Sequence, residues 1–534
     1  MTGVAPSWDM IVVGGGMCGV ALAHQVERSL GAGARVLLLE ASPELGGRAR
    51  TRYTEQGRAV DLGAHYFGVK HRRVRALAER LCPDAIFERS AVYGRDPASR
   101  GRFGGAYRVT PRSRTFFDVQ GLERDGPLVD RLAIVRSMSL HLMLEGLVDV
   151  GAPWRTPLAP WLDRLTFADW IDLQDVPAWI TEMWGLGSMG ILSIAPRDIS
   201  LLYWLWYQAS NGGLLFTAND YAGGAQEFSL RCGMGGLVHA LARELERTEV
   251  RLSAPVNSVH HGERGQVRVQ LADGSQETAR AVVIAATPHA VERNVTFEPP
   301  LDPRRARLLG QRAGHSAKVV LTYAEPFWHD SHGHHLMSYA AGPDADGLEW
   351  GLDTSDPRGD SHSLMFFVSP RLFERLGPDA DEAAIERAIL DAAVEMTGEA
   401  RAAHPIRVDF QVWARERWFG GGPNTVMGPG VLSRLEGILG EPEGPEGRLW
   451  FASAEQSFEA TGYVEGALAA AEHAASRVTE LLTTRDGIRT APPPRRTPAR
   501  RSSAPVQAAL AGAAYALLGP ALAAARWWAA RSEL

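Results

Sequence analysis

The sequence predicts an α/β fold of two domains, and three observations support this. The chain has 534 residues, which at roughly 100 to 200 residues per domain exceeds one packed unit. Hydrophobic residues make up 45% and charged residues 22%, a globular composition that excludes global disorder and a many-pass membrane protein. A short apolar run, Met10 to Val13, leads into a glycine-rich turn and then a helical pattern, which is the order of a βα unit.

Charge and cysteine content exclude several classes of function. The 56 basic residues nearly balance the 62 acidic ones, giving a net charge of -6, so we expect no nucleic-acid partner. Cys18, Cys82 and Cys232 lie too far apart in the sequence for a Cys-x-x-Cys pair, and we expect neither a disulfide framework nor a metal site. The first residues lack a basic stretch followed by an apolar segment, so we expect no secretory signal.

The amino-terminal turn has the pattern of a dinucleotide-binding site. Gly14, Gly16 and Gly19 form a Gly-x-Gly-x-x-Gly turn between a strand and a helical pattern of alanine and leucine. Backbone N–H groups at the start of that helix would point towards a pyrophosphate. The second predicted strand, residues 35–39, ends at Glu40, where an acid accepts hydrogen bonds from ribose hydroxyls and disfavours a 2′-phosphate. The alternative is an ordinary βα turn without a ligand.

A second glycine pair follows this acid. Gly46 and Gly47 allow another close approach of the backbone to a ligand, and Arg48 brings a positive charge for a phosphate or a flavin. Residues 60–68 then read Val-Asp-Leu-Gly-Ala-His-Tyr-Phe-Gly. These residues resemble the flavin monoamine oxidase family, and the resemblance recurs along nearly the whole chain. It implies FAD as cofactor and a two-domain amine oxidase fold, with a Rossmann-like dinucleotide-binding domain and a mixed α+β substrate domain.

Near its far end the chain resembles the closing flavin motif of that family. Residues 448–455 form a predicted strand that ends at Glu455, and a polar loop leads to an alanine-rich helix that begins at Tyr463. The resemblance implies that the backbone N–H groups of Tyr463 and Val464, with the positive end of the helix dipole, stabilise negative charge on the flavin. The alternative is a packed helix without a ligand.

The middle of the chain resembles the segment by which the family returns to its nucleotide domain. The resemblance places Gln226 on the cavity wall and Val256 beside the adenine. Apolar residues alternate or cluster on both sides of Asp273 and Gly274, which predicts a β-hairpin. We therefore expect the nucleotide domain to form from three pieces of sequence.

Lysine is almost absent from the chain. Lys70 and Lys318 are the only two lysines among 56 basic residues. Residues 314–328 resemble the family's lysine strand, which implies that the Lys318 ammonium holds a water against flavin N5. Because arginine carries charge elsewhere, this lysine predicts a role for a compact donor whose pKa can shift. The alternative is a lysine kept by chance.

The chain departs from the family at two positions: the residue that attaches the flavin and one of the two aromatic rings that flank the substrate amine. Gly422 aligns with the cysteine that carries the flavin in covalent members, so we expect non-covalent FAD. Pro423 aligns with one of two parallel aromatic rings, while Tyr463 supplies the other. Trp418 or Phe419 is a candidate replacement for the missing ring. The resemblance therefore predicts the flavin more firmly than an aryl-alkylamine substrate.

Two residues of the 60–68 segment are candidates on the substrate side. The resemblance places His65 and Tyr66 there, and His65 is a candidate proton acceptor; the alternative is a structural histidine. Seven of the fifteen tryptophans lie between Trp154 and Trp206. We expect most of these to pack in the core and a minority to line an apolar cavity.

The carboxyl-terminal region differs in composition from the packed domains. Residues 486–505 form a Pro- and Arg-rich linker. Residues 506–525 are apolar and long enough to span a bilayer, although half of them are alanine and Gly519-Pro520 would kink a helix. The resembled membrane-bound oxidases also carry a carboxyl-terminal anchor. We expect a cytoplasmic protein tethered to the membrane by this helix; the alternative is a helix docked on the protein itself.

These observations divide the chain and predict its reaction. The expected boundaries are 7–88, 231–300 and 420–485 for the FAD-binding domain, 89–230 and 301–419 for the substrate domain, 486–505 for the linker and 506–534 for the apolar helix. By the resemblance, we expect oxidation of an amine C–N bond to an imine, with O2 as acceptor and H2O2 as product. Two alternatives stay open: a flavin dehydrogenase or desaturase of a cyclic or amino-acid-derived intermediate with another acceptor, and a non-catalytic flavin-binding scaffold. A homodimer also stays open.

Overall fold

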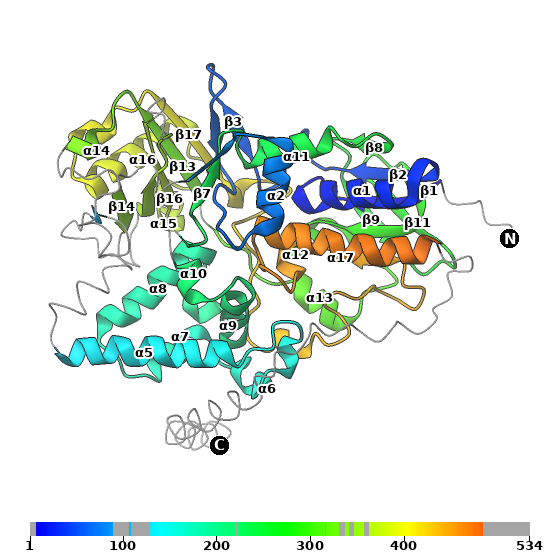
Figure 1. The fold of residues 1–534 in the computed structure, drawn as a ribbon, viewed down its shortest axis with the longest axis horizontal. Helices are drawn as coiled ribbons and strands as arrows, with labels where there is room; N and C mark the ends of the chain where they lie inside the picture. Colours follow the sequence, from blue (N-terminus) through cyan, green and yellow to red (C-terminus); the bar gives the residue numbers. More distant parts are fainter. Residues whose placement is uncertain are drawn as a thin grey trace.

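The computed structural model describes residues 7–88, 106–107, 128–218, 223–315, 317–330, 337–340, 347–356 and 362–483. In this part of the chain the elements form two large sheets, two small two-stranded sheets and a helical region (Figure 1). The apolar tail, residues 506–534, and the linker lie outside the described residues, so their predicted roles stay predictions. Within the described residues, no helix combines the length and the apolar character needed to cross a membrane.

An eight-stranded sheet combines strands from distant parts of the sequence. Five of them run parallel in the order β8-β2-β1-β11-β18, because β11 pairs with β1 on one edge and with β18 on the other. The first half of β11 also pairs antiparallel with β10, which confirms the predicted hairpin. The strands are β1 (Trp8–Val13), β2 (Val36–Leu39), β8 (Thr248–Arg251), β9 (Val256–His260), β10 (Val267–Leu271), β11 (Gln276–Ile284), β12 (Thr296–Glu298) and β18 (Leu449–Phe451).

The parallel strands and their covering helices follow from the apolar pattern of the sequence. All four residues of β2 are buried, as expected of a parallel strand covered on both faces. Helices α1 (Met17–Leu30) and α17 (Val464–Thr483) run side by side against the sheet (Figure 1). Alanines at 467, 471 and 474 are buried between them and the core, because small side chains let helix backbones approach closely. Helix α11 (Met234–Ala242) completes this layer.

A second, six-stranded sheet has the order β17-β13-β16-β15-β14-β6. Its second strand, β13, is buried along all seven residues and pairs antiparallel with both neighbours. Helix α16 (Glu382–Thr397) packs on the six-stranded sheet through Ile385, Ile389 and Ala393. The strands are β6 (Ala106–Tyr107), β13 (Ala317–Tyr323), β14 (Met337–Ala340), β15 (Leu348–Asp353), β16 (His362–Val368) and β17 (Arg407–Val412).

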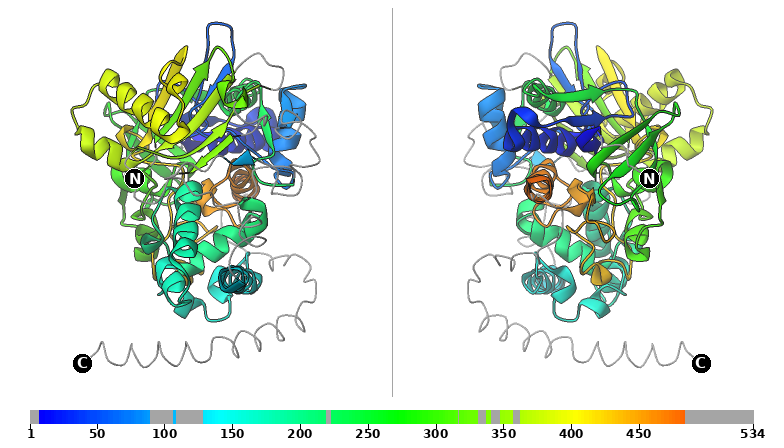
Figure 2. Two further views of the ribbon diagram at one scale, coloured as in Figure 1. Left: turned by 90° about the vertical axis from the view of Figure 1, so that its left-hand side faces the viewer. Right: turned by 90° about the vertical axis from the view of Figure 1, so that its right-hand side faces the viewer.

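The helical region packs around an aromatic core. Trp184, Trp204 and Trp206 are fully buried there, so the expectation that these tryptophans pack in the core is confirmed. Figure 2 shows this region below the six-stranded sheet. Its helices are α5 (Leu128–Gly146), α6 (Ala159–Leu162), α7 (Phe167–Asp172), α8 (Ala178–Leu192), α9 (Leu201–Ser210) and α10 (Leu214–Thr217).

Shorter elements connect these three regions. They include two two-stranded sheets, β3-β4 and β5-β7. Further elements are β3 (Thr51–Tyr53), β4 (Ala59–Asp61), β5 (Ile86–Glu88), β7 (Phe228–Leu230), α2 (Arg72–Leu81), α12 (Pro288–Asn294), α13 (Pro303–Leu309), α14 (Phe327–Asp330) and α15 (Pro370–Leu376). The mixture of a largely parallel sheet, an antiparallel sheet and covering helices confirms the predicted α/β class.

Candidate active site

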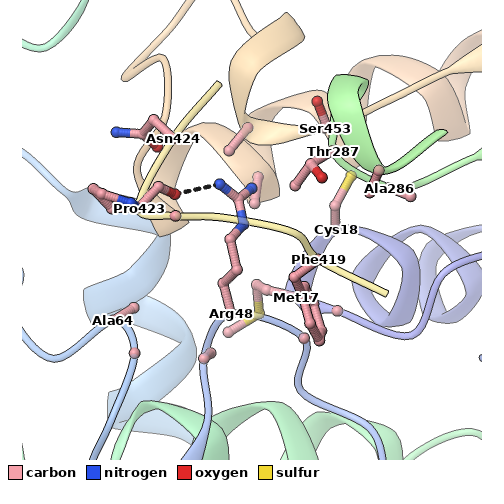
Figure 3. A pocket seen from close by; sticks show the side chains of 18 of the residues that line it. Met17, Cys18, Arg48, Ala64, Ala286, Thr287, Phe419, Pro423, Asn424 and Ser453 are labelled. Carbon is pink, nitrogen blue, oxygen red and sulfur yellow. Dashed lines mark hydrogen bonds between the residues drawn. The ribbon is translucent and has the colours of Figure 1, made fainter. Parts of the chain in front are cut away.

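A cavity of about 350 Å³ is lined by all three regions of the molecule. Its cofactor end, as we call it, is formed by the loops that follow β1 and β2 and by the starts of α1 and α17. Its substrate end is formed by side chains of α8, α9, β13, β15 and β16. Figure 3 shows part of the lining, where Arg48 reaches across towards Pro423.

The three glycines of the first turn have three different structural reasons. Gly14 has a φ of +112°, and a Cβ there would lie 2.7 Å from the carbonyl oxygen of Ala285. A Cβ on Gly19 would lie 1.9 Å from the Gly14 oxygen, so this glycine allows α1 to pack against the turn. A Cβ on Gly16 would meet no described atom closer than 3.9 Å. Its missing side chain therefore leaves cavity space open rather than relieving a clash within the protein.

The acid at the end of β2 lies at the cofactor end, as the sequence predicts. Glu40 is buried and lines the cavity. Its Oε2 accepts a hydrogen bond from the Gly15 amide at 2.6 Å, and its Oε1 accepts one from the Ser42 amide at 2.7 Å. A carboxylate has about four lone-pair positions, so acceptor capacity remains for the two hydroxyls of a ribose.

Several features of the cofactor end fit FAD. Met17 and Val464, the first residues of α1 and α17, both line the cavity, so the positive ends of two helix dipoles face it. Gly47, with a φ of +60°, lies close to Gly16. The Thr287 hydroxyl is buried, lines the cavity and has no hydrogen-bond partner within the described protein, which is the state expected of a group that serves a ligand.

Arg48 and Glu455 form an ion pair beside the cavity. Arg48 Nη1 donates to Glu455 Oε1 and to the Pro423 carbonyl oxygen, both at 2.5 Å, and Nη2 donates to Glu455 Oε2 at 3.1 Å. Glu455 is 1% exposed. Burial tends to raise the pKa of this carboxyl, but the charge and hydrogen bonds of Arg48 outweigh burial and hold it below its usual value. The Arg48 guanidinium thus joins the amino-terminal segment to two points of the segment 420–485, at Pro423 and Glu455.

Lys318 projects from β13 into the cavity. It is 5% exposed, and its Nζ donates to the Gly63 carbonyl oxygen at 2.9 Å. Burial lowers the pKa of Lys318 to about 8, against the opposing effect of the Asp61 carboxylate. The side chain is therefore a buried donor whose charge changes near neutral pH.

His65 forms a hydrogen-bonded pair with Asp61, a carboxylate that is not among the site residues predicted from the sequence. Its Nδ1 lies 2.8 Å from Asp61 Oδ2, and its Nε2 lies 3.3 Å from the Ser229 hydroxyl. Asp61 is buried and also accepts from the Met234 amide at 3.0 Å. The carboxylate favours the tautomer in which Nδ1 carries the proton. The spacing of four residues between Asp61 and His65 was the available sequence signal.

Aromatic and aliphatic side chains surround the substrate end. The Tyr463 ring lies 6.1 Å from that of Tyr207, at an interplanar angle of 35°. Burial raises the pKa of Tyr207, and Tyr463 raises it further, so the Tyr207 phenol stays neutral. Trp350 and Phe367 stack at 6.0 Å with 14° between their planes. These residues line the cavity together with Tyr66, Ile191, Gln226 and Met365.

The chain has a proline at the position that aligns with the family's second aromatic ring. Pro423 lines the cavity, and so do Trp418 and Phe419. Phe419 packs edge-on against Trp413 at 5.4 Å, and Arg417 lies 4.4 Å from the centroid of the Trp418 ring. Both candidate replacement rings are thus engaged with neighbours of their own segment.

All but two of the predicted site residues line this one cavity. The exceptions are Gly19, which packs behind the turn, and Glu455, which acts through Arg48. One expectation is corrected: the Tyr463 amide donates to the Ala460 carbonyl oxygen at 3.0 Å. This N–H closes the turn before α17, so it is not available to a flavin. Within the described residues, no group of three potential metal ligands comes together.

A dinucleotide cradle that opens into an apolar chamber with a buried lysine defines an FAD-dependent oxidoreductase. Residues 17–479 match the family described as flavin containing amine oxidoreductase, and the chain belongs to this family.

Individual relatives agree with this assignment. The chain is 27% identical over 492 residues to flavin-containing amine oxidase B of Sus scrofa, covering 89% of this chain and 86% of the relative. It is 26% identical over 488 residues to the Homo sapiens enzyme of that name, with the same coverage. Among solved structures, cyclohexylamine oxidase from Brevibacterium oxydans IH-35A has 27% identity and a TM-score of 0.75, covering 89% of this chain and 99% of that one.

A more distant structure supports the fold alone. Putrescine oxidase bound to putrescine is 21% identical, with a TM-score of 0.72, and the match covers 88% of this chain and 98% of that one. The FAD-dependent amine oxidase fold predicted from the sequence is therefore confirmed by the family and by solved structures.

Proposed function

We propose that this protein oxidises the C–N bond of a small apolar amine to an imine, with dioxygen as acceptor and hydrogen peroxide as product. The observation that carries the proposal is that Lys318 and Tyr463 line the same chamber as the glycine cradle, although 145 residues separate them in the sequence. The similarity to cyclohexylamine oxidase supports an apolar and cyclic amine as substrate.

The cofactor in this proposal is non-covalent FAD. Gly422, which lines the cavity, has no side chain that could attach a flavin. Cys18 is the cysteine that lines the cavity, and its thiol donates to the Ala452 carbonyl oxygen at 3.5 Å. Burial raises the pKa of Cys18 to about 12, so the thiol stays protonated and unreactive. Bound FAD would supply the two-electron acceptor for the hydrogen on the carbon next to nitrogen.

The walls of the substrate end would bind and orient a neutral amine. Trp350, Phe367 and Ile191 give the chamber apolar walls, and a poorly hydrated site would disfavour the ammonium form of the substrate. Tyr463 offers a ring face against which the amine packs. Positioning of this kind, rather than acid–base chemistry at the carbon, is what the reaction requires of the walls.

His65 would take up the proton that the amine loses on binding. Its Nε2 is the acceptor in the tautomer that Asp61 favours. Once His65 is protonated, the Asp61 carboxylate stabilises the imidazolium. In this role Asp61 is a positioning residue and His65 holds the proton.

Lys318 would act in the half-reaction with oxygen. A buried ammonium favours the negative charge that develops on oxygen as it is reduced. Its bond to the Gly63 carbonyl oxygen fixes the direction of the side chain.

The deciding experiment is anaerobic bleaching of the purified yellow protein with a panel of primary, secondary and cyclic amines. We expect bleaching by at least one apolar amine and, under air, one hydrogen peroxide per amine oxidised. Denaturation should release the flavin into solution, because its attachment is non-covalent. The peroxide yield tests the acceptor separately from the amine chemistry.

A second candidate is a dehydrogenase that passes electrons to another acceptor. Pro423 favours it, because it interrupts the aromatic cage expected for an aryl-alkylamine. Bleaching without peroxide, followed by rapid reoxidation with a soluble quinone, would select this candidate. A flavin that no amine bleaches would overturn both and leave a flavin-binding scaffold.

A further inference from the structure

Two cysteines that are 150 positions apart in the sequence meet in the fold. Cys82 ends helix α2, and Cys232 lies two residues before helix α11 begins. Between them, β5 and β7 pair antiparallel, with Ile86 opposite Leu230. This pairing brings the two cysteines to the same end of a small sheet.

Backbone hydrogen bonds beyond the sheet hold the segments of the two cysteines close to each other. The Arg231 amide donates to the Ala85 carbonyl oxygen at 2.9 Å, and the Ala85 amide donates to the Cys82 carbonyl oxygen at 3.1 Å. The bond from Arg231 extends the strand pairing to the residue before Cys232. The bond from Ala85 closes a turn that brings Cys82 towards the same place. The two side chains pack against the same apolar cluster, and Cys82 lies near enough to Cys232 to influence its pKa.

Both thiols have the access that a reaction needs. Cys82 and Cys232 are free and only partly buried, whereas Cys18 is buried. Burial, followed by the neighbouring Cys82 side chain, raises the pKa of Cys232 far above its usual value. Cys232 therefore keeps its proton, and its thiol donates to the Gly233 carbonyl oxygen at 3.5 Å, so we expect Cys82 to be the sulfur that reacts first.

We propose that Cys82 and Cys232 are a redox modification site, which hydrogen peroxide converts to a disulfide. The Cys82 thiol attacks one peroxide oxygen, so that the O–O bond breaks, Cys82 becomes a sulfenic acid and one water leaves. The Cys232 sulfur then attacks the Cys82 sulfur. The S–O bond breaks, the S–S bond forms, and the Cys232 proton leaves with the oxygen as a second water.

The position of the pair connects it to the active site. The Met234 amide, two residues after Cys232, donates to Asp61 at 3.0 Å, and Asp61 holds His65. The oxidant is the peroxide that the proposed reaction releases, and only this source rests on the proposed function. A cross-link here would therefore lie beside the segment that positions the proton acceptor.

The test uses the resting holoenzyme with added hydrogen peroxide and no amine, so that it does not depend on turnover. After treatment and denaturation without reductant, we expect the titratable thiols to fall from three to one. Peptide mapping should show the fragments of Cys82 and Cys232 joined, and dithiothreitol should restore all three thiols. Cys18 serves as an internal control, because its buried thiol should stay free.

Single substitutions separate the two roles. Cys82→Ser should keep both remaining thiols after peroxide, because the sulfur that reacts first is gone. Cys232→Ser should accumulate a sulfenic acid at Cys82, which a dimedone probe traps. The proposal is overturned if all three thiols survive, if Cys18 is consumed first, or if the disulfides formed join separate chains. Bleaching by amines is measured independently, so a failure here leaves the proposed function untouched.

Discussion

The two ends of the cavity are built in different ways. The cofactor end consists mainly of backbone: Gly14, Gly16 and Gly47 shape it, and two helix starts face it. The substrate end consists of side chains that come from elements far apart in the sequence, such as Tyr207 on α9 and Trp350 on β15. Glycine geometry is local, whereas a wall of side chains exists only once the whole fold has formed. We therefore expect the cofactor end to be damaged by substitutions that add a side chain to a glycine. We expect the substrate end to be damaged by substitutions that remove side-chain atoms.

Arg48, which links the amino-terminal segment to Pro423 and Glu455, should show the largest effect. Arg48→Met leaves the buried Glu455 carboxylate without its partner, so we expect the free energy of unfolding to fall by about 3 to 5 kcal/mol. Urea unfolding measures this, and Arg48→Met combined with Glu455→Gln should recover part of the loss. A loss below about 1 kcal/mol would show that the pair is only a surface-like contact.

The pH dependence of the same pair has a definite sign. The pKa of Glu455 is lowered in the folded protein, because Arg48 outweighs the effect of burial. Its contribution to stability is therefore present above the carboxyl's unfolded pKa and is lost as the pH falls through the lowered value. The Arg48→Met protein should lack this acid-side loss.

The second largest effect is expected at the substrate end. Lys318→Met removes the buried ammonium, and loss of one such group slows a reaction by about 100-fold, so reoxidation of the reduced protein by oxygen should slow by that factor. Because burial lowers the pKa of Lys318 to about 8, the wild-type rate should fall as the pH rises through that value, and the variant should lack this limb.

Lys70 provides the matched control for Lys318. It is the other lysine of the chain, it is exposed, and it donates to the Gly212 carbonyl oxygen at 2.7 Å. Lys70→Met should therefore leave both the reoxidation rate and its alkaline limb unchanged. An unchanged rate in Lys318→Met would remove the role proposed for that lysine.

Two glycine substitutions test the cofactor end. A Cβ on Gly19 would lie 1.9 Å from the Gly14 oxygen, so Gly19→Ala should lower the free energy of unfolding by about 1 to 3 kcal/mol. Gly16→Ala meets only ordinary contacts and should fold normally, while its Kd for FAD rises about tenfold, or about 1.4 kcal/mol. Unchanged FAD affinity in Gly16→Ala would show that the cofactor does not pass this residue.

An effect as small as that of Gly16→Ala is expected at Tyr463. Tyr463→Leu removes the one ring that this chain has of the two expected from the family, so kcat/KM for the best amine should fall about tenfold, equivalent to about 1.4 kcal/mol. FAD content should stay unchanged, because the Tyr463 amide is committed to Ala460. Tyr463→Phe keeps the ring face and is the control; an equal loss in both variants would assign the effect to the hydroxyl instead.

The same contrast explains what the sequence could predict. The strand, glycine turn, helix and acid at residues 10–40 follow one another directly, so their local pattern carries the whole motif. The pairing of His65 with Asp61 has only a four-residue spacing as its sequence signal, and the meeting of Cys82 with Cys232 has none. Both depend on tertiary contacts that no local pattern records.

Aromatic residues also show that the sequence does not separate core residues from residues that line the cavity. The tryptophan-rich stretch drew attention to Trp184, Trp204 and Trp206, but these fill the core. The rings that line the cavity include Tyr207, Trp350 and Phe367, which no composition or periodicity distinguishes from core residues. Whether a ring faces a core or a chamber is decided by the packing of neighbouring elements.

The order of strands also has a consequence for biosynthesis. Strand β18 pairs with β11, α17 packs on α1, and Glu455 pairs with Arg48. A nascent chain that has left the ribosome only as far as β11 therefore exposes an unfinished sheet edge and an uncovered apolar helix. Capture of FAD must wait for the last quarter of translation, so the half-made protein is the form that most needs a chaperone.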